Sequence, residues 1–191
     1  MTTIVLLRHP RPALPEAGLC YGRLDPELRP GWQAEIDALT LPVLRDALLW
    51  TSPSRRCAAP ARRLAARLGL QVRVDERLQE LDFGDWEGLS WDQVPRAALD
   101  LWAGDLLAFA PPGGETGAAL VERVGRFHGM LRADARSAIV VSHGGPLRVL
   151  SPLLRDVPVD LAAPAMDFLA GQALTLASSR VLKNPRTMQS L

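Results

Sequence analysis

Short apolar runs and longer amphipathic stretches alternate along the chain. Four runs rich in leucine, isoleucine or valine have the length of strands, and they cover residues 3–7, 47–50, 71–74 and 137–141. Apolar residues elsewhere recur at helical spacing, which predicts helices over residues 30–41, 54–68, 90–107, 115–131 and 146–154. Pro95 and Gly104 interrupt the third of these helices, and residues 77–88 are expected to form a loop.

This order of elements indicates the class of fold. Strands that alternate with helices favour an α/β fold, and we expect a three-layer α/β/α sandwich with a mainly parallel central sheet. A chain of 191 residues, 48% of them hydrophobic, is long enough for one sizeable core but short for two domains. We therefore expect a single domain over residues 1–183, followed by a poorly ordered tail over residues 184–191.

Polar side chains follow three of the predicted strands directly. Arg8 and His9 end the first, Ser52 follows the second, and His143 comes two residues after the fourth. Ligands of parallel α/β sheets bind beyond the carboxyl ends of the strands. We therefore expect these side chains to converge on one site.

Composition narrows the classes of partner. The formal charge is +1, from 22 basic and 21 acidic residues, so the net charge gives no reason to expect nucleic acid or an anionic membrane. No apolar run approaches the roughly 20 residues that span a bilayer, and the first residues lack the basic segment of a secretory signal. The cytoplasm is the expected compartment. Two cysteines and three histidines, scattered along the chain, suggest neither a disulfide framework nor a zinc site, and we expect no cofactor.

The residues at the predicted strand ends suit one kind of chemistry. Transfer from a phosphoester needs a neutral nucleophile, cations around the non-bridging oxygens, and an acid for the leaving oxygen. A histidine such as His9 has an ordinary alternative explanation, a hydrogen bond within a turn. Its neighbour Arg8 and the second histidine, His143, favour the chemical interpretation.

Five segments, in the same order along the chain, resemble the histidine phosphatase superfamily, also called phosphoglycerate mutase-like. They cover the chain from about residue 4 to 150, and each is weak on its own. The segments are residues 7–9 (Leu-Arg-His), 28–34 (Leu-Arg-Pro-Gly-Trp-Gln-Ala), 52–57 (Ser-Pro-Ser-Arg-Arg-Cys), 80–88 (Glu-Leu-Asp-Phe-Gly-Asp-Trp-Glu-Gly) and 142–145 (Ser-His-Gly-Gly).

The resemblance implies a role for each matching residue. His9 attacks phosphorus and becomes a phosphohistidine, and Glu80 serves first as general acid and then as general base. Phosphate oxygens are bound by Arg8, Arg56 and an imidazolium at His143, and no metal is needed. Backbone groups at Gly22 and Gly144 are assigned to the same phosphate.

Some of these residues have competing interpretations. Arg56 belongs to an arginine-rich helix whose solvated face explains most of the arginines, and Glu87 is an alternative acid to Glu80. His128 and two tryptophans, Trp86 and Trp91, are expected to be structural.

The loop after His9 departs from the family pattern. Proline and arginine occupy residues 10–12, where many relatives have Gly-Glu-Thr, and Pro15 replaces a phosphate-binding asparagine. Residues 18–25 instead resemble the loop of bacterial α-ribazole phosphatase-like members. This resemblance implies α-ribazole 5′-phosphate, a cobalamin precursor, as substrate. Arg11, Tyr21 and Glu115 are the candidate substrate contacts.

Two other functions remain open. A mutase returns the phosphoryl group to another hydroxyl, but the interval between Glu80 and His143 is shorter than we expect for phosphoglycerate mutases, which favours hydrolysis. A non-catalytic phosphate-binding or regulatory protein is disfavoured because all five chemical positions are present. The expected partner is a small phosphorylated metabolite, and the oligomeric state is left open.

Overall fold

The computed structural model describes residues 2–176 except 16, 17 and 45. Five strands form one sheet in the order β3-β2-β4-β1-β5, and the first four of these are parallel to one another. This confirms the predicted mainly parallel sheet. The strands are β1 (Thr2–Arg8), β2 (Leu48–Thr51), β3 (Gln71–Val74), β4 (Ala138–Ser142) and β5 (Gly171–Leu176).

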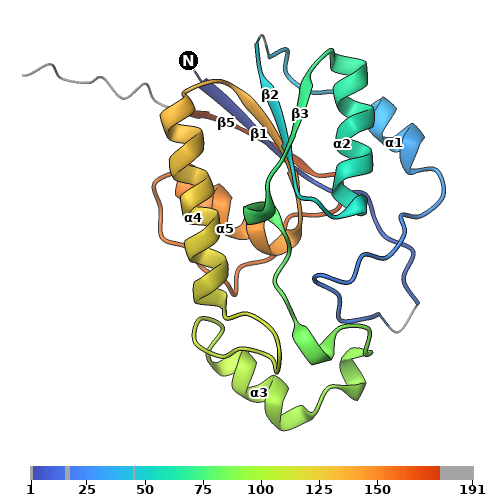
Figure 1. The fold of residues 1–191 in the computed structure, drawn as a ribbon, viewed down its shortest axis with the longest axis vertical. Helices are drawn as coiled ribbons and strands as arrows, with labels where there is room; N and C mark the ends of the chain where they lie inside the picture. Colours follow the sequence, from blue (N-terminus) through green and yellow to red (C-terminus); the bar gives the residue numbers. More distant parts are fainter. Residues whose placement is uncertain (1, 16–17, 45, 177–191) are drawn as a thin grey trace, which may run out of the picture.

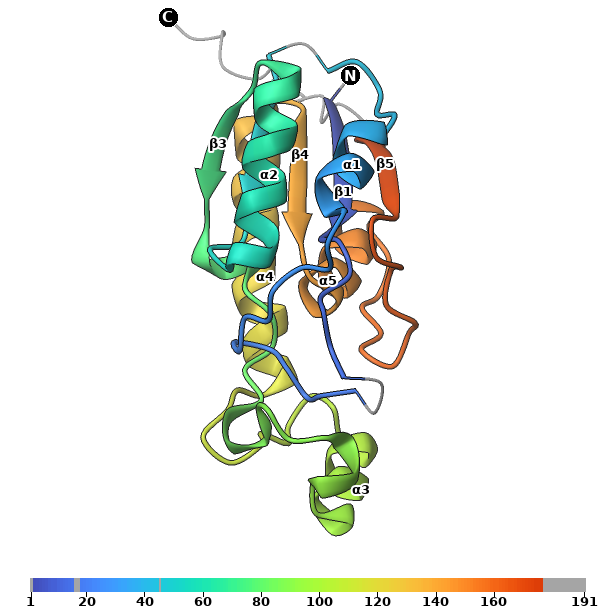
Figure 2. The same cartoon turned by 90° about the vertical axis from the view of Figure 1, so that its right-hand side faces the viewer.

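Helices cover both faces of this sheet (Figure 2). The α-helices are α1 (Trp32–Ala38), α2 (Arg55–Leu68), α3 (Arg96–Gly104), α4 (Gly117–Asp134) and α5 (Gly144–Leu154). One core cluster joins α1 and α2 to one face, and a second joins α4 and α5 to the other. The three-layer sandwich is therefore confirmed.

The two central strands explain why the layers pack as they do. Leu6 of β1 and Val140 of β4 pack with α4 and α5, whereas their neighbours Leu7 and Val141 pack with α1 and α2. Strands buried on both faces read as continuous apolar runs, and β4 is buried throughout. The runs that marked these strands in the sequence therefore reflect helices on both sides.

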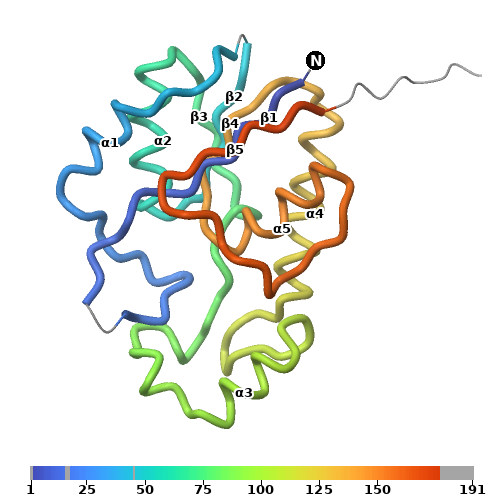
Figure 3. Tube along the Cα trace, turned by 180° about the vertical axis from the view of Figure 1, so that it is seen from behind, coloured from blue at the N-terminus to red at the C-terminus, as the bar shows by residue number. Residues whose placement is uncertain are grey.

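The structure differs from the predicted elements at two places. The stretch 90–107 is not one helix: residues Trp91–Gln93 form a 3₁₀ turn, and α3 begins only after Pro95. Proline disfavours helical dihedral angles in the residue before it, which separates the two segments. Strand β5 has no counterpart among the predicted elements. It lies antiparallel to β1 at the edge of the sheet (Figure 3) and is mostly half-exposed, so its apolar signal is weak.

Residues 83–109 form an aromatic cap beyond the carboxyl ends of the parallel strands, with α3 at its far end (Figure 1). Trp86 and Val94 are buried in it beside Cys20, and the half-buried aromatic residues Phe83, Trp91, Trp102 and Phe109 surround them. The cap is the part of the fold that faces the strand ends. No helix among the described residues combines the length and apolar composition needed to cross a bilayer. The predicted tail, residues 184–191, lies outside the described residues.

Candidate active site

The two histidines meet because their strands are neighbours. Arg8 at the end of β1 is in register with Ser142 at the end of β4, and the His9 amide donates to the Ser142 carbonyl at 3.0 Å. The imidazole centroids of His9 and His143 are 5.2 Å apart in an edge-to-face arrangement. Ser52, which follows β2, places its Oγ 2.8 Å from Nε2 of His143. The structure thus brings the three predicted strand ends together.

His9 is held in a form that suits a nucleophile. Its Nδ1 lies 2.7 Å from the carbonyl oxygen of Pro10, which makes Nδ1 the protonated nitrogen and leaves the lone pair on Nε2. The side chain is buried, and this desolvation, together with the nearby Arg56 and Arg8 charges, lowers its pKa from 6.5 to about 3 despite the hydrogen bond to Pro10. His9 is therefore neutral at physiological pH.

Arg8 retains donors for an anion. One guanidinium nitrogen donates to the Met166 carbonyl at 2.6 Å, and the guanidinium carbon lies 3.9 Å from the centroid of the Phe168 ring. Its Nε is buried without a hydrogen-bond partner among the described residues. Burial lowers the pKa of Arg8, but the guanidinium stays charged at neutral pH because its ordinary pKa lies far above 7.

Arg56 is not on a solvated face. It is only 1% exposed, and its Nη groups donate to the carbonyls of Gly22 and Leu24 at 2.5 and 2.8 Å and to Asp25 at 3.1 Å. Only Nε is left without a partner in the described part of the chain. Arg56 therefore holds the 22–25 loop with most of its donors. Of its donors, Nε is the one left for the phosphate contact that the resemblance implies.

Gly22 is required where it lies, since an added Cβ would be 1.8 Å from the carbonyl oxygen of Leu81. Its carbonyl accepts from Arg56, so this residue contributes to the loop that supports the site. Glu87 supports the same loop, because its carboxylate accepts from the amides of Arg23, Leu24 and Phe83. These hydrogen bonds give Glu87 a structural role and disfavour it as the general acid.

His143 differs in charge from the expectation. It is fully buried, and burial, followed by the nearby Arg56 charge, lowers its pKa well below 6.5. The Sγ of Cys57 lies 3.4 Å from Nε2, on the side of the ring that packs against α2. The imidazole of His143 is therefore neutral in this structure, whereas the resemblance implied an imidazolium.

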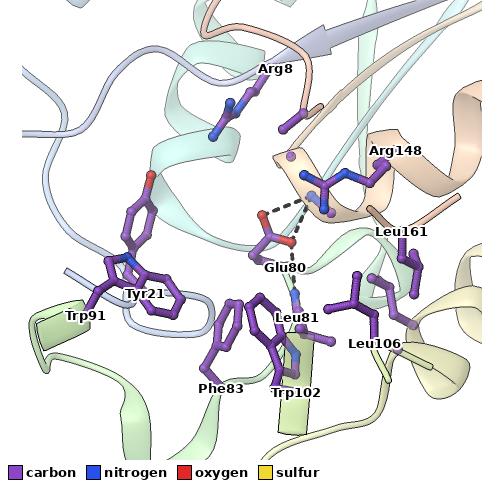
Figure 4. A pocket seen from close by; sticks show the side chains of 15 residues that line it. Arg8, Tyr21, Glu80, Leu81, Phe83, Trp91, Trp102, Leu106, Arg148 and Leu161 are labelled. Carbon is purple, nitrogen blue, oxygen red and sulfur yellow. Dashed lines mark hydrogen bonds between the residues drawn. The ribbon is translucent and has the colours of Figure 1, made fainter. Parts of the chain in front are cut away.

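Glu80 lies below Arg8 in Figure 4, and both side chains line one cavity. The amide of Gly145, in the first turn of α5, donates to both carboxylate oxygens at 3.1 and 3.2 Å, and the amide of Leu81 donates at 3.0 Å. A Cβ at Gly145 would lie 2.2 Å from Oε1 of Glu80, so a glycine is needed for this contact. The helix N-terminus therefore fixes where the carboxyl group lies.

The loop that carries Glu80 is anchored by an arginine that the sequence patterns did not single out. Arg123 of α4 donates to the carbonyls of Arg77, Gln79 and Glu80 at 2.7 to 3.0 Å. It also donates to the Glu115 carboxylate at 2.6 Å. The one available signal was its place beside Val124, on the apolar face of the predicted helix.

This network changes the interpretation of Glu115. Its carboxylate binds Arg123 and accepts from the amide of Asp82 at 3.2 Å, and it does not line the cavity. The predicted contact with substrate is replaced by a contact that orders the acid-bearing loop. Arg11 is also outside the cavity lining, with its guanidinium carbon 5.0 Å from the centroid of Phe168.

A cavity of about 260 Å³ is lined by Arg8 and Glu80, whereas His9, Arg56 and His143 are not among its lining residues. Arg8, Tyr21, Glu80 and Gly144 line it as candidates from the sequence. Trp91 lines it as well, although it was expected only to pack. Sequence reasoning missed Arg148, which projects toward Glu80 from α5 (Figure 4), and the apolar lining residues Phe83, Trp102, Leu106, Leu120, Leu161 and Ala165.

Comparisons with known proteins agree with this geometry. Residues 4–167 match the model of the histidine phosphatase superfamily (branch 1). The chain is 35% identical over 173 residues to glucosyl-3-phosphoglycerate phosphatase of Mycobacterium tuberculosis, covering 82% of this chain and 76% of the relative. It is 30% identical over 166 residues to putative phosphoserine phosphatase 2 of Hydrogenobacter thermophilus, covering 84% and 82%. This chain belongs to the histidine phosphatase superfamily.

The fold agrees with solved structures of the same family. The α-ribazole phosphatase from Shigella flexneri has a TM-score of 0.77 and 23% identity, covering 93% of this chain and 92% of that one. The expected class of enzyme, a phosphoric monoester hydrolase, is confirmed by the family and by its phosphatase relatives.

Proposed function

We propose that this protein hydrolyses a small phosphomonoester through a phosphohistidine on His9 and without a metal. The observation that carries the proposal is a buried, neutral imidazole whose Nδ1 is bound to a carbonyl, next to Arg8, which lines one cavity together with Glu80. A nucleophile with a free Nε2, a cation and a carboxyl group are the parts that the reaction needs.

In the first step, Nε2 of His9 attacks phosphorus in line with the ester oxygen. The nitrogen–phosphorus bond forms as the phosphorus–oxygen bond to the alcohol breaks, and protonated Glu80 gives its proton to the leaving oxygen. Arg8, Nε of Arg56 and His143 donate hydrogen bonds to the equatorial oxygens. Charge on the phosphoryl group is thus met by fixed donors in a buried site.

In the second step, water attacks the phosphohistidine. The Glu80 carboxylate takes a proton from this water, the nitrogen–phosphorus bond breaks, and phosphate leaves with His9 again neutral. Transfer to a second hydroxyl of the same substrate, as in a mutase, would use the same residues but no water.

The finer proposal for the substrate is α-ribazole 5′-phosphate, supported by the resemblance of residues 18–25 to α-ribazole phosphatase-like loops. Two of the relatives at 30% identity or more bear other substrates in their names, glucosyl-3-phosphoglycerate and phosphoserine. A comparison of kcat/KM for these three esters, with 3-phosphoglycerate as the mutase substrate, tests the assignment. α-Ribazole 5′-phosphate should be preferred, and isomerisation of 3-phosphoglycerate would favour the mutase.

Trapping the intermediate tests the chemistry itself. After rapid mixing with a ³²P-labelled ester, we expect an acid-labile, alkali-stable label on the wild-type protein and none on His9→Asn. The matched control is His128→Asn, a half-buried histidine of α4 away from the cavity, which should label and turn over normally. Normal turnover by His9→Asn would overturn the nucleophile, and absence of turnover for every ester would favour a binding protein.

The role of Glu80 has a separate test. For Glu80→Gln, we expect a larger loss of kcat with alkyl esters than with an activated aryl ester, since only the alkyl alcohol needs a proton as it leaves. Equal losses would argue against a general acid.

The cytoplasmic location and the single domain over residues 1–183 stay predictions.

A further inference from the structure

We propose that the cavity selects phosphomonoesters whose alcohol carries a flat aromatic group, and that an aromatic wall of Phe83, Trp91 and Trp102 binds that group. This inference rests on the proposed phosphatase function and names its substrate class. It concerns the alcohol that leaves, whereas Arg8, His9 and His143 act on the phosphoryl group that stays.

The position of the wall points to the leaving alcohol. Phosphorus must lie next to His9 and Arg8, and the ester oxygen must lie within reach of Glu80. In Figure 4 the Glu80 carboxylate lies between Arg8 and the rings of Phe83 and Trp102. An alcohol that extends from the ester oxygen past Glu80 therefore meets these rings.

The rings of the wall hold one another in place. Phe83 makes edge-to-face contacts with Trp91 and Trp102, with centroids 5.8 and 5.9 Å apart. The two tryptophan rings are within 21° of parallel, with centroids 6.2 Å apart. Trp102 also packs edge-to-face on the buried Trp86. The wall is thus ordered before a ligand binds, which reduces the entropy lost on binding.

The burial of these rings is incomplete. Phe83, Trp91 and Trp102 are half-exposed, although Trp86 and Val94 of the same cluster are buried. Exposed aromatic surface is costly in water, and an aromatic group stacked on it removes that cost. The exposed faces line the cavity, where a ligand can reach them.

The remaining walls disfavour alcohols that carry no apolar group. Leu106, Leu120 and Leu161 line the cavity with the aromatic residues, and Arg148 is the one further charged group beside Arg8 and Glu80. A sugar ring placed against these leucine side chains would bury its hydroxyl groups against carbon atoms, where the hydroxyl groups lack hydrogen-bond partners. The volume of about 260 Å³ exceeds the roughly 150 Å³ in which an apolar cavity holds a benzene ring, so a ring and a short linker fit.

Three primary alkyl esters of similar intrinsic reactivity test the proposal: 2-(2-naphthyl)ethyl phosphate, 2-cyclohexylethyl phosphate and ribose 5-phosphate. We expect kcat/KM for the naphthyl ester to exceed that for ribose 5-phosphate by roughly tenfold or more, with the cyclohexyl ester between them. Equal or faster hydrolysis of ribose 5-phosphate, with phosphohistidine formed on His9, would overturn the inference and leave the proposed function standing.

Substitutions of Trp102 test whether the aromatic wall causes the preference for the naphthyl ester. For Trp102→Leu, kcat/KM should fall much more for the naphthyl ester than for ribose 5-phosphate, so that most of the preference is lost, and Trp102→Phe should retain most of the preference. The matched control is Trp32→Leu in α1, outside the cavity, which should keep the preference. Equal loss on both esters for Trp102→Leu, or loss of the preference in the control, would refute the role of the wall.

A binding measurement separates failure of this inference from failure of the proposed function. By calorimetry, 2-(2-naphthyl)ethylphosphonate, which cannot be hydrolysed, should bind at least tenfold more tightly than methylphosphonate, and Trp102→Leu should remove the difference. If no ester is turned over but this difference is found, the proposed function fails and the aromatic subsite stands. Equal affinities would overturn the subsite.

Discussion

Arg123→Met tests how the acid-bearing loop is held. Arg123 is 8% exposed and donates to three carbonyls of residues 77–80 as well as to Glu115. Methionine has a similar length and no donor. The substitution therefore leaves the Glu115 carboxylate, which is 17% exposed, with the Asp82 amide at 3.2 Å and Arg23 at 3.8 Å.

The expected loss of stability follows from these contacts. Removal of one partner of a buried ion pair costs about 3–5 kcal/mol, because the other charge stays buried. Hydrogen bonds from a charged group contribute about 1.5–3 kcal/mol each, and they are not additive within one network. Since Glu115 keeps some contact with solvent and with Arg23, we expect the lower end of the range, about 3 kcal/mol.

A control on the same helix separates this effect from the loss of any arginine. Arg126 pairs with Glu122 across one exposed turn of α4, and its side chain is 59% exposed. Exposed pairs of this kind contribute about 0.3–0.5 kcal/mol. Urea unfolding, followed by tryptophan fluorescence, should therefore give a much smaller loss for Arg126→Met than for Arg123→Met.

The same variants report on catalysis. If Arg123 positions Glu80, the stably folded fraction of Arg123→Met should lose more activity on alkyl esters than on an activated aryl ester, and Arg126→Met should behave as wild type. A free-energy loss below about 1 kcal/mol, or equal to that of Arg126→Met, would refute the reasoning from the buried ion pair. Equal activity losses on both esters would refute the link to Glu80.

Three further predictions concern the site. Gly145→Ala displaces Glu80 and should lower kcat on an alkyl ester roughly tenfold or more. In the control Gly129→Ala, the added Cβ meets nothing within 4 Å, and kcat should not fall. Equal effects of the two substitutions would contradict the contact between Gly145 and Glu80. Because burial lowers the pKa of His9 from 6.5 to about 3, the unfolded chain binds a proton in this window that the native state does not. The free energy of unfolding should therefore decrease as the pH is lowered from 6.5 to 3. In urea titrations, His9→Asn should reduce the slope of this free energy against pH by about 1.4 kcal/mol per pH unit; an unchanged slope would mean that His9 is not buried in its neutral form. Excess EDTA should leave turnover unchanged, and a loss reversed by added metal would contradict the metal-free mechanism.

The central elements were predictable because their signals are local. Strand β4 was expected at residues 137–141 and lies at Ala138–Ser142, and β3 was expected with its observed bounds. Strand β5 was not predicted, since a half-exposed edge strand is defined by its pairing with β1 rather than by its own apolar residues. The interruption of the 90–107 stretch at Pro95 and Gly104 was predicted, and α3 begins after Pro95 and ends at Gly104; the 3₁₀ turn before Pro95 was not predicted.

The residues of the candidate site also divide into those with a local sequence signal and those placed by packing alone. Arg8, His9 and His143 were found because they follow apolar strands, and Glu80 because of a motif. Arg123, Arg148 and Trp102 lie on helices or turns without any local signal of chemistry, and only packing places them near Glu80.

The sequence by itself determined the order of strands and helices, and it determined which polar residues follow strands at the site. Hydrophobic periodicity and chain connectivity are properties of neighbouring residues, so they can be seen without a structure. Only the tertiary structure decided the charge of His143, the loop-holding bonds of Arg56 and the partner of Glu115. Burial and hydrogen bonding to distant residues set these properties, since solvation and charge depend on what surrounds a side chain in space. The aromatic wall, too, exists only once the cap folds over the strand ends.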